Sequence, residues 1–166
     1  MLERGAMATS GLTANLRGAV EEFYTDYAWS LDRRRTDAWI GFFADRGRYS
    51  LTTRENAEGA GMFLIFEEGQ AAIARRAAVA SGYLRAQRNK TLHMISNVHA
   101  RMSADGEIEA RAYFAMFRTA RDKTSQLHAC GEFDDRLVVI EDRLRFLVHH
   151  VIFDAETLPS NMADLY

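Results

Sequence analysis

The chain has 166 residues, of which 48% are hydrophobic and 27% are charged, and these proportions are typical of one folded domain. With 21 basic and 23 acidic side chains the net charge is −2, which argues against nucleic-acid binding as the main role. The single cysteine, Cys130, excludes an internal disulfide and cannot supply the thiolates of an iron–sulfur cluster. No apolar run reaches the ~18 residues of a membrane span, so we expect a cytoplasmic protein without a membrane partner.

Helical periodicity dominates the first half of the chain. Residues 1–11 lack an apolar signal core, and we expect a flexible tail there, followed by a single α+β domain over residues 12–166. Apolar side chains recur at helical spacing over residues 12–29, and the composition of residues 67–84 favours a second long helix. Between them the pattern predicts a short helix around Trp39 capped by Thr36 or Asp37, a short strand at 47–53 and a loop at 53–61.

From Thr91 the hydrophobic period changes to two, which predicts four long strands joined by short turns. Consecutive long strands with short connections form an antiparallel meander. The helices must then cover one face of a curved sheet of four or five strands, which is an α+β fold.

The alternation within each strand assigns its residues to two faces. We expect Leu92, Met94, Phe146 and His150 on the face that the helices cover. The other face mixes arginines with aromatic side chains, which is typical of a protein–protein interface. The alternative is that the chain's own tail covers this face.

The five histidines do not form a local metal site. His93 and His99 lie on one face of the same strand but roughly 20 Å apart, at 3.3 Å per residue. His149 and His150 are adjacent, so they point to opposite faces. We therefore expect no metal on this chain, unless residues from different strands come together.

A histidine–carboxylate pair is the stronger enzymatic hypothesis. Across the turn at residues 141–142, Asp135 falls diagonal to His150 on the covered face. A carboxylate that orients an imidazole in an apolar cavity is what a general base requires. The alternative is a histidine that is buried and paired for structural reasons. Cys130 is expected to be a small buried hydrophobe rather than a nucleophile.

Five segments between about Leu16 and the end of the sequence resemble, in order and spacing, a known family. They are residues 39–49 with the loop around Asn56, 91–98 (TLHMISNV), 113–119 (YFAMFRT), 131–137 (GEFDDRL) and 153–162 (FDAETLPSNM). The family comprises the small, β subunits of bacterial aromatic-ring-hydroxylating dioxygenases. The sequence departs from it at Lys90 or Thr91, where the family has arginine, and over residues 143–146, where a glycine and a tryptophan are frequent.

The resemblance implies a cone-shaped fold of the nuclear-transport-factor-two-like superfamily, with N-terminal helices packed on a strongly curved, mainly antiparallel sheet. It also implies a non-catalytic structural subunit of an α3β3 oxygenase. In that family the α subunit oxidises an aromatic compound with O2 and electrons from NAD(P)H. That α subunit holds the Rieske [2Fe-2S] cluster and a mononuclear iron, so no cofactor is expected on this chain.

In such a complex the β subunits form a trimer and dock α subunits. The contact residues that we predict are His93, Asn97, Arg111, Tyr113, Phe117, Arg118 and Arg145. The same fold also hosts free-standing isomerases, dehydratases and cyclases. The alternative function is therefore a small-molecule enzyme that uses His150 as general base and Asp135 to orient it. The aromatic substrate and its regiochemistry stay open.

Overall fold

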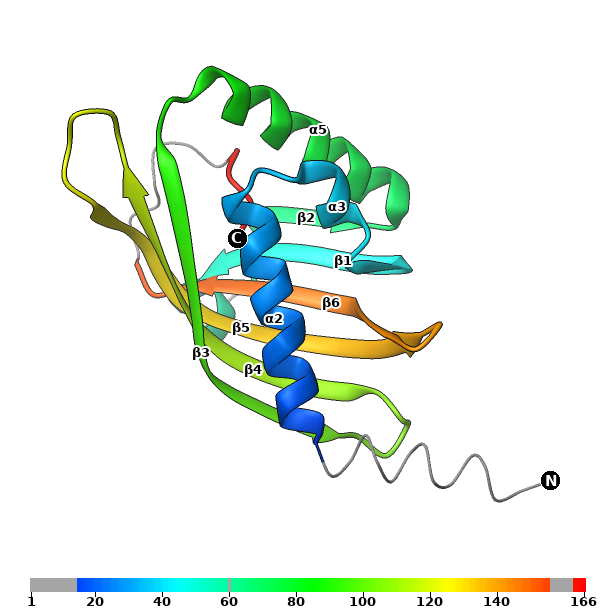
Figure 1. Cartoon of the computed structure of the whole chain (residues 1–166). Helices are drawn as coiled ribbons and strands as arrows, with labels where there is room; N and C mark the ends of the chain where they lie inside the picture. The colour runs from blue at the N-terminus through cyan, green and yellow to red at the C-terminus, as the bar shows by residue number, and fades with distance from the viewer. Residues whose placement is uncertain (1–14, 60, 156–162) are drawn as a thin grey trace.

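The computed structural model describes residues 15–59, 61–155 and 163–166 (Figure 1). The tail predicted at 1–11 lies outside these residues. The described helices are α2 (Leu16–Asp32), α3 (Thr36–Ile40), the one-turn α4 (Arg54–Glu58) and α5 (Gln70–Ala86). None of them has the length and hydrophobicity needed to cross a membrane.

The described strands form one curved sheet with the order β2-β1-β6-β5-β4-β3. The helices α2, α3 and α5 lie on one side of it (Figure 1). All neighbours are antiparallel except β1 and β6, which run parallel. The predicted α+β architecture is therefore confirmed. The bounds of the strands are β1 Phe43–Thr53, β2 Ile65–Glu68, β3 Lys90–Met102, β4 Ile108–Thr119, β5 Gln126–Ile140 and β6 Arg143–Phe153.

The described part of the sheet has six strands rather than the four or five expected from sequence. The additional strand is β2, which is too short for its alternation to be recognised in the sequence. Gly69, with a φ of +81°, separates β2 from α5, so the helix begins at Gln70 rather than at residue 67. Neither Thr36 nor Asp37 caps α3, because Arg35 occupies the N-cap position.

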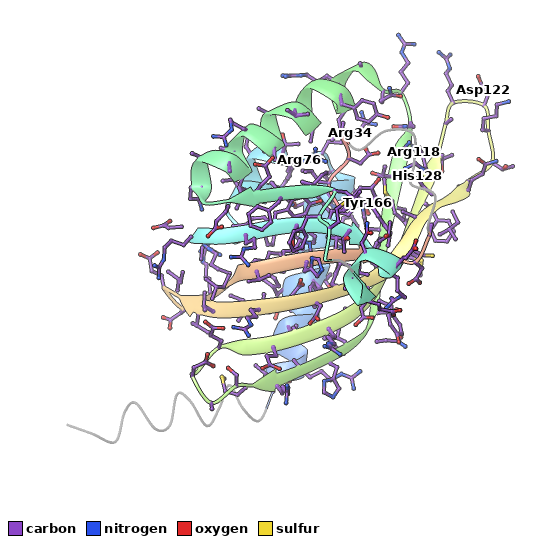
Figure 2. All side chains as sticks on the ribbon, turned by 180° about the vertical axis from the view of Figure 1, so that it is seen from behind. Arg34, Arg76, Arg118, Asp122, His128 and Tyr166 are labelled. Atoms are coloured by element: carbon purple, nitrogen blue, oxygen red, sulfur yellow. The ribbon has the colours of Figure 1, made fainter. Side chains whose placement is uncertain are left out.

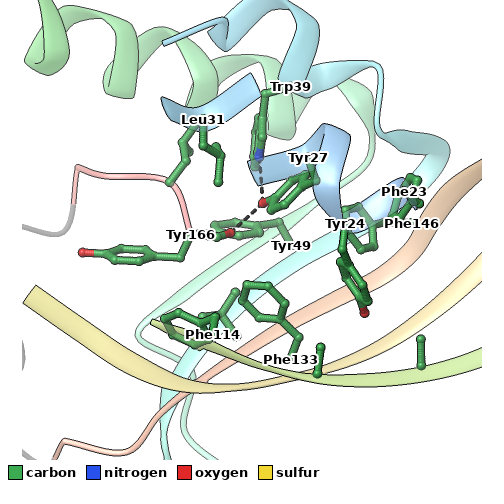
Figure 3. Close-up of a cluster of buried hydrophobic side chains, with 14 of the residues drawn as sticks. Phe23, Tyr24, Tyr27, Leu31, Trp39, Tyr49, Phe114, Phe133, Phe146 and Tyr166 are labelled. Carbon is green, nitrogen blue, oxygen red and sulfur yellow. Dashed lines mark hydrogen bonds between the residues drawn. The ribbon is translucent and has the colours of Figure 1, made fainter. Parts of the chain in front are cut away.

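Aromatic side chains fill the space between the helices and the sheet (Figure 3). Tyr27 of α2 contacts Phe146 of β6 edge-to-face, with ring centroids 5.2 Å apart. Phe133 of β5 stacks on Phe114 of β4 at 4.7 Å. Trp39 of α3 is fully buried beside these rings. Such pairs add to the hydrophobic stabilisation of the core, and they leave little empty space within the cone.

Among the register shifts of the sheet, those in β3 and β6 decide which histidines face the core. In β3 the pairing with β4 shifts between Ser96 and His99, and Asn97 there has a φ of +56°. In β6 the pairing with β5 shifts beside Arg136 and Leu137. A β-bulge inserts one residue into a strand, so beyond it the opposite set of side chains points inward.

Candidate functional site

The bulge in β6 determines which histidine is buried beneath α2. One extra residue in β6, opposite Arg136 and Leu137, moves the inward-facing positions along by one. His149 is therefore fully buried, and His150 lies partly exposed on the opposite face. The prediction that His150 shares the covered face with Asp135 is wrong, although Asp135 is buried there as expected.

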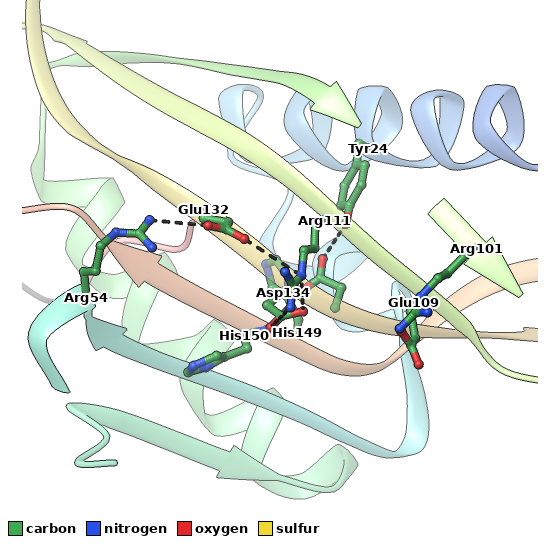
Figure 4. A network of polar contacts seen from close by, with 10 residues as sticks. Tyr24, Arg54, Arg101, Glu109, Arg111, Glu132, Asp134, His149 and His150 are labelled. Carbon is green, nitrogen blue, oxygen red and sulfur yellow. Dashed lines mark hydrogen bonds and ion pairs between the residues drawn. The ribbon is translucent and has the colours of Figure 1, made fainter. Parts of the chain in front are cut away.

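Asp135 accepts three hydrogen bonds inside the core. Its Oδ2 accepts from the Tyr24 hydroxyl at 2.7 Å. Its Oδ1 accepts from Nδ1 of His149 at 2.9 Å and from the main-chain N–H of His150 at 3.1 Å. Figure 4 shows Tyr24 and the two histidines gathered there. Burial, with the neighbouring Asp135 as a further cause, raises the pKa of Tyr24 well above its usual value, so the phenol stays a donor.

The other nitrogen of the His149 ring, Nε2, lies 3.1 Å from the Tyr27 hydroxyl and 3.1 Å from the main-chain oxygen of Tyr166. The Tyr27 hydroxyl donates to the same Tyr166 oxygen at 2.5 Å and accepts from Nε1 of Trp39 at 2.9 Å (Figure 3). Burial raises the pKa of Tyr27 well above its usual value. Both nitrogens of the His149 ring thus have fixed partners and no access to solvent, which is the arrangement of a structural histidine.

His150 lies on the outer face, in contact with β1. Its Nδ1 is 2.8 Å from Oγ of Ser50, and its ring meets Phe63 edge-to-face at 5.5 Å. Burial lowers the pKa of His150 below the ordinary 6.5, against the opposing effect of Asp134 and Asp135. Burial also lowers the pKa of His128, and the charge of Arg118 adds to this shift.

These two histidines predict how stability depends on pH. Because the folded protein binds a proton at them less readily than the unfolded chain, unfolding is favoured as the pH falls below about 7. Chemical denaturation between pH 7.5 and 5 should show a falling free energy of unfolding. The free energy of unfolding of the double variant His128→Gln/His150→Gln should fall less over the same pH interval. That of His99→Gln, a substitution at an exposed histidine, should fall as much as in the unchanged protein. Equal slopes for all three proteins would contradict the assignment.

The bulge in β3 likewise separates two histidines that the sequence pattern placed on one face. His93 is buried and faces α2, whereas His99, beyond Asn97, is exposed. The prediction of a shared face is wrong because the inserted residue reverses the alternation. For the same reason Leu92 and Met94 are exposed rather than covered.

A second histidine–aspartate pair lies where α2 ends beside β3. Nδ1 of His93 is 2.7 Å from Oδ1 of Asp32, and the His93 side chain is 3% exposed. Because a carboxylate only accepts, Nδ1 carries the hydrogen, and Nε2 of the neutral ring is left with a free lone pair. Within the described residues Nε2 has no hydrogen-bond partner. This pair therefore has the orientation of a general base with an unpartnered Nε2, whereas Nε2 of His149 lies against the Tyr27 hydroxyl and the Tyr166 main-chain oxygen.

A small cavity of about 10 Å³ is lined by His93, Ser30, Asp164 and Leu165, among others. The Ser30 hydroxyl, like Nε2 of His93, has no hydrogen-bond partner in the part of the chain that the structure describes. A space of this size holds about one water molecule. The pair thus borders a cavity that is too small for an aromatic substrate.

Residues 163–166 lie at the end of the molecule near α5 (Figure 1), and Asp164 and Leu165 line this cavity. Asp164 pairs with the guanidinium of Arg118 and lies 3.8 Å from Nε2 of His128. Its main-chain oxygen accepts from Arg76 at 2.8 Å. Figure 2 shows Arg76, Arg118, His128 and Tyr166 at this end of the molecule. Arg118, predicted as a contact residue, is therefore directed toward Asp164 rather than outward.

Apolar side chains form rows across the outer face of β3, β4 and β5. Leu92 is paired with Phe117, which is paired with Leu127. The side chains of Leu92 and Leu127 are 51% and 55% exposed. Tyr113, two positions further along the same face of β4, is 56% exposed. We call the surface of Leu92, Met94, Tyr113, Phe117 and Leu127 the apolar face.

Charged pairs continue this outer face toward the turns. Arg111 bonds to Asp134 at 3.2 Å, and Arg54 reaches Glu132 at 3.4 Å (Figure 4). The Arg111–Asp134 pair is largely solvated, so it contributes little to stability, whereas the Glu132 side chain is only 19% exposed. The alternating signs of these charges make the face suited to a partner of mixed charge.

The predicted contact residues do not all lie on this surface. Arg111, Tyr113 and Phe117 lie on the outer face of β4, with Asn97 exposed nearby at the bulge of β3. His93 is buried, so it is not available for a contact. Arg145 lies in β6, where it bonds to the main-chain oxygen of Leu144 at 3.2 Å. The contacts of the outer residues with a partner stay a prediction.

Sequence reasoning missed Asp32, Tyr24, Tyr27 and Tyr166 as polar partners. Tyr24 and Tyr27 belong to the helical apolar pattern predicted over residues 12–29, and their hydroxyls were a signal that polar partners are buried nearby. Cys130, expected to be buried, is partly exposed. Among the described residues no group of three or more histidine, cysteine or acidic side chains has the geometry of a metal site.

The arrangement of helices on a curved, mostly antiparallel sheet is the cone of the nuclear-transport-factor-two-like superfamily. A family model, the SnoaL-like domain, matches residues 13–150. The chain therefore belongs to the SnoaL-like family.

The chain is similar to the anthranilate 1,2-dioxygenase small subunit of Burkholderia cepacia, with 23% identity over 138 residues, which cover 82% of this chain and 86% of the relative. A solved β subunit of a putative aromatic-ring-hydroxylating dioxygenase from Novosphingobium aromaticivorans superimposes with a TM-score of 0.79 at 20% identity, covering 92% of this chain and 97% of that one. A putative scytalone dehydratase from the same organism has a TM-score of 0.69 at 16% identity, with coverage of 94% and 95%.

Proposed function

We propose that this protein is a structural β subunit of an aromatic-ring-hydroxylating dioxygenase and has no catalytic centre of its own. The observation that carries the proposal is the similarity to the anthranilate 1,2-dioxygenase small subunit over most of both chains. The filled cone supports it, because the space beneath α2 is occupied by aromatic rings and by the bonded pair of Asp135 and His149. A substrate would have to displace this core.

In this proposal the partner α subunit holds the Rieske [2Fe-2S] cluster and the mononuclear iron and oxidises the aromatic compound. This chain organises the complex as a trimer onto which the α subunits dock. The apolar face supplies the contact surface, because an exposed set of large apolar side chains bordered by paired charges is typical of an interface.

Affinity purification of this chain from its source organism tests the proposal. The expected eluate is coloured, absorbs as an iron–sulfur protein and contains a larger second chain. A colourless chain that elutes alone, from cells that express such an oxygenase, would overturn the proposal.

Tyr113→Ala is predicted to weaken the complex without unfolding the chain. The ring is more than half exposed in this chain, so its loss leaves no cavity in the core. Truncating an aromatic residue central to an interface commonly weakens binding about tenfold or more. Sedimentation of the purified complex should show dissociation at higher concentration than for the unchanged protein. Val79→Ala, on the exposed side of α5, is the matched control. Unchanged assembly of Tyr113→Ala would remove this residue from the interface.

A second function, a free-standing dehydratase or isomerase, is favoured by one observation. His93 is oriented by Asp32, its Nε2 has no hydrogen-bond partner among the described residues, and the residue lines a small cavity. This pair replaces His150 and Asp135 as the candidate base and its orienting carboxylate. The enzymatic alternative requires the cavity to open beyond its present 10 Å³. The test is an NMR screen of the isolated chain against small hydroxylated aromatic compounds. Chemical shift changes at His93 on adding a compound would support the enzymatic alternative. If no compound causes such changes, the His93–Asp32 pair is structural.

A further inference from the structure

The chain leaves α2 through a turn of three consecutive arginines. Arg34 has a φ of +56°, and its main-chain N–H donates to the main-chain oxygen of Leu31 at 2.9 Å. The N–H of Arg35 donates to the main-chain oxygen of Ser30 at 2.9 Å. This is the Schellman motif, in which a residue with positive φ ends a helix and two main-chain hydrogen bonds fix the turn. The main chain therefore fixes the places of Arg33 and Arg35 on either side of Arg34.

The three arginines of this turn differ in their partners. The guanidinium of Arg34 donates to the main-chain oxygen of Leu84 near the end of α5, at 2.6 Å. Arg33 and Arg35 are exposed, and neither side chain forms a hydrogen bond or an ion pair with another residue that the structure describes. The guanidinium of Arg33 instead lies over the ring of Trp29, 4.4 Å from its centroid. Within the described residues, two cations are thus left without a carboxylate partner beside an exposed aromatic ring.

A hollow of about 460 Å³ lies beside these two arginines. Its lining includes Asp26, Trp29, Arg33, Arg35, Ala38 and Phe42, which come from α2, the turn, α3 and the start of the chain toward β1. Trp29, Ala38 and Phe42 supply apolar walls, and the two arginines supply positive charge. A concave surface with apolar walls and a few convergent charged groups is typical of a site for a small molecule.

We propose that this hollow binds an aromatic monocarboxylate. The carboxylate lies between Arg33 and Arg35, because the planar guanidinium group matches a carboxylate with two parallel hydrogen bonds. The ring packs against Ala38 and Phe42. Asp26 lies seven residues before Arg33, roughly 10 Å away along the helix axis, so a second negative group on the ligand would meet it. This inference rests on α2, α3 and the turn and stands whether or not the protein is a dioxygenase subunit.

An acidic segment of another protein fits the hollow less well than a small aromatic acid. The carboxylates of Asp and Glu side chains would pair with the two arginines, but they would leave the apolar walls at Ala38 and Phe42 uncovered. A run of acidic side chains would also bring further negative charge toward Asp26. One carboxylate joined directly to an apolar ring satisfies both the charged and the apolar parts of the lining.

Tryptophan fluorescence of the full chain tests this proposal. Of the two tryptophans, Trp29 lines the hollow and Trp39 is fully buried, so a ligand in the hollow should change the emission of Trp29. The probe is sodium benzoate, and its emission change should saturate and should vanish in Trp29→Phe. Benzamide keeps the ring without the charge, and acetate keeps the charge without the ring. Each of these controls should bind about tenfold more weakly than benzoate, or weaker still.

Substitutions of exposed side chains locate the site without disturbing the core. Arg33→Gln and Arg35→Gln should each raise the dissociation constant of benzoate about tenfold. Asp26→Asn should lower it about twofold, because a repelling charge is removed. Arg75→Gln, at an exposed position of α5, is the matched control and should leave it unchanged. Unchanged affinity in both turn variants, or equal binding of benzoate and either control compound, would overturn the proposal. Tighter binding of a heptaglutamate peptide than of benzoate would overturn it in favour of an acidic protein partner.

Discussion

Gly131→Ala is expected to cost roughly 3 kcal/mol of folding free energy, because a side chain at this position has no space. Gly131 of β5 pairs with Phe153 of β6. An added Cβ would overlap the main-chain oxygen of Ile152 and lie 3.0 Å from its carbonyl carbon and from Cα of Phe153. All three atoms belong to the main chain of the paired strand. They cannot move aside without separating β5 from β6.

Urea denaturation followed by tryptophan fluorescence measures this effect. Gly82→Ala is the matched control, because a Cβ at Gly82 meets no atom within 4 Å and the residue lies inside α5. That substitution should stabilise the protein by about 0.5–1 kcal/mol, since alanine is the better helix former. A Gly131→Ala variant as stable as the unchanged protein would mean that the strands are less closely paired there than the structure shows.

Asp135→Ala is expected to have a comparable or larger effect, about 3–5 kcal/mol. The carboxylate accepts hydrogen bonds from Tyr24, from the ring of His149 and from the main-chain N–H of His150. Removing it leaves all three donors without an acceptor in a core that water does not reach. Each unsatisfied buried donor costs about 1–3 kcal/mol, so the loss greatly exceeds that of the carboxyl group's packing alone.

The neighbouring Asp134 provides the control for this experiment. It points to the outer face, where it pairs with Arg111 in a solvated ion pair, and its side chain is 44% exposed. Asp134→Ala should therefore change the free energy of unfolding by less than about 1 kcal/mol. Equal losses for the two variants in urea denaturation would contradict the buried position of Asp135.

The fold class followed from the change of hydrophobic period at Thr91, because periodicity reports directly which faces are buried. The parallel pairing of β1 with β6 did not follow, since no local pattern specifies a partner about a hundred residues away. The identity of the buried histidine was also missed. A strict alternation that begins at Phe146 places His150 inside, and only the bulge brings His149 there.

Each bulge nevertheless left a signal in the sequence. In β6 the buried residues Phe146 and Val151 are five positions apart, a spacing that strict alternation does not allow for one face. In β3 the bulge contains Asn97, a residue type that adopts positive φ more readily than most others. The pairing of Asp32 with His93 left no such signal, because it joins a helix end to a strand 61 residues later.

The parallel pairing of β1 with β6 also governs the order in which the protein can fold during its synthesis. Arg48 pairs with Val148, so one side of β1 has no partner until the ribosome has made 100 further residues. At about 5–20 residues per second, this takes on the order of 5–20 s. During that time β1 has only β2 beside it. The nascent chain therefore spends seconds with an incomplete sheet.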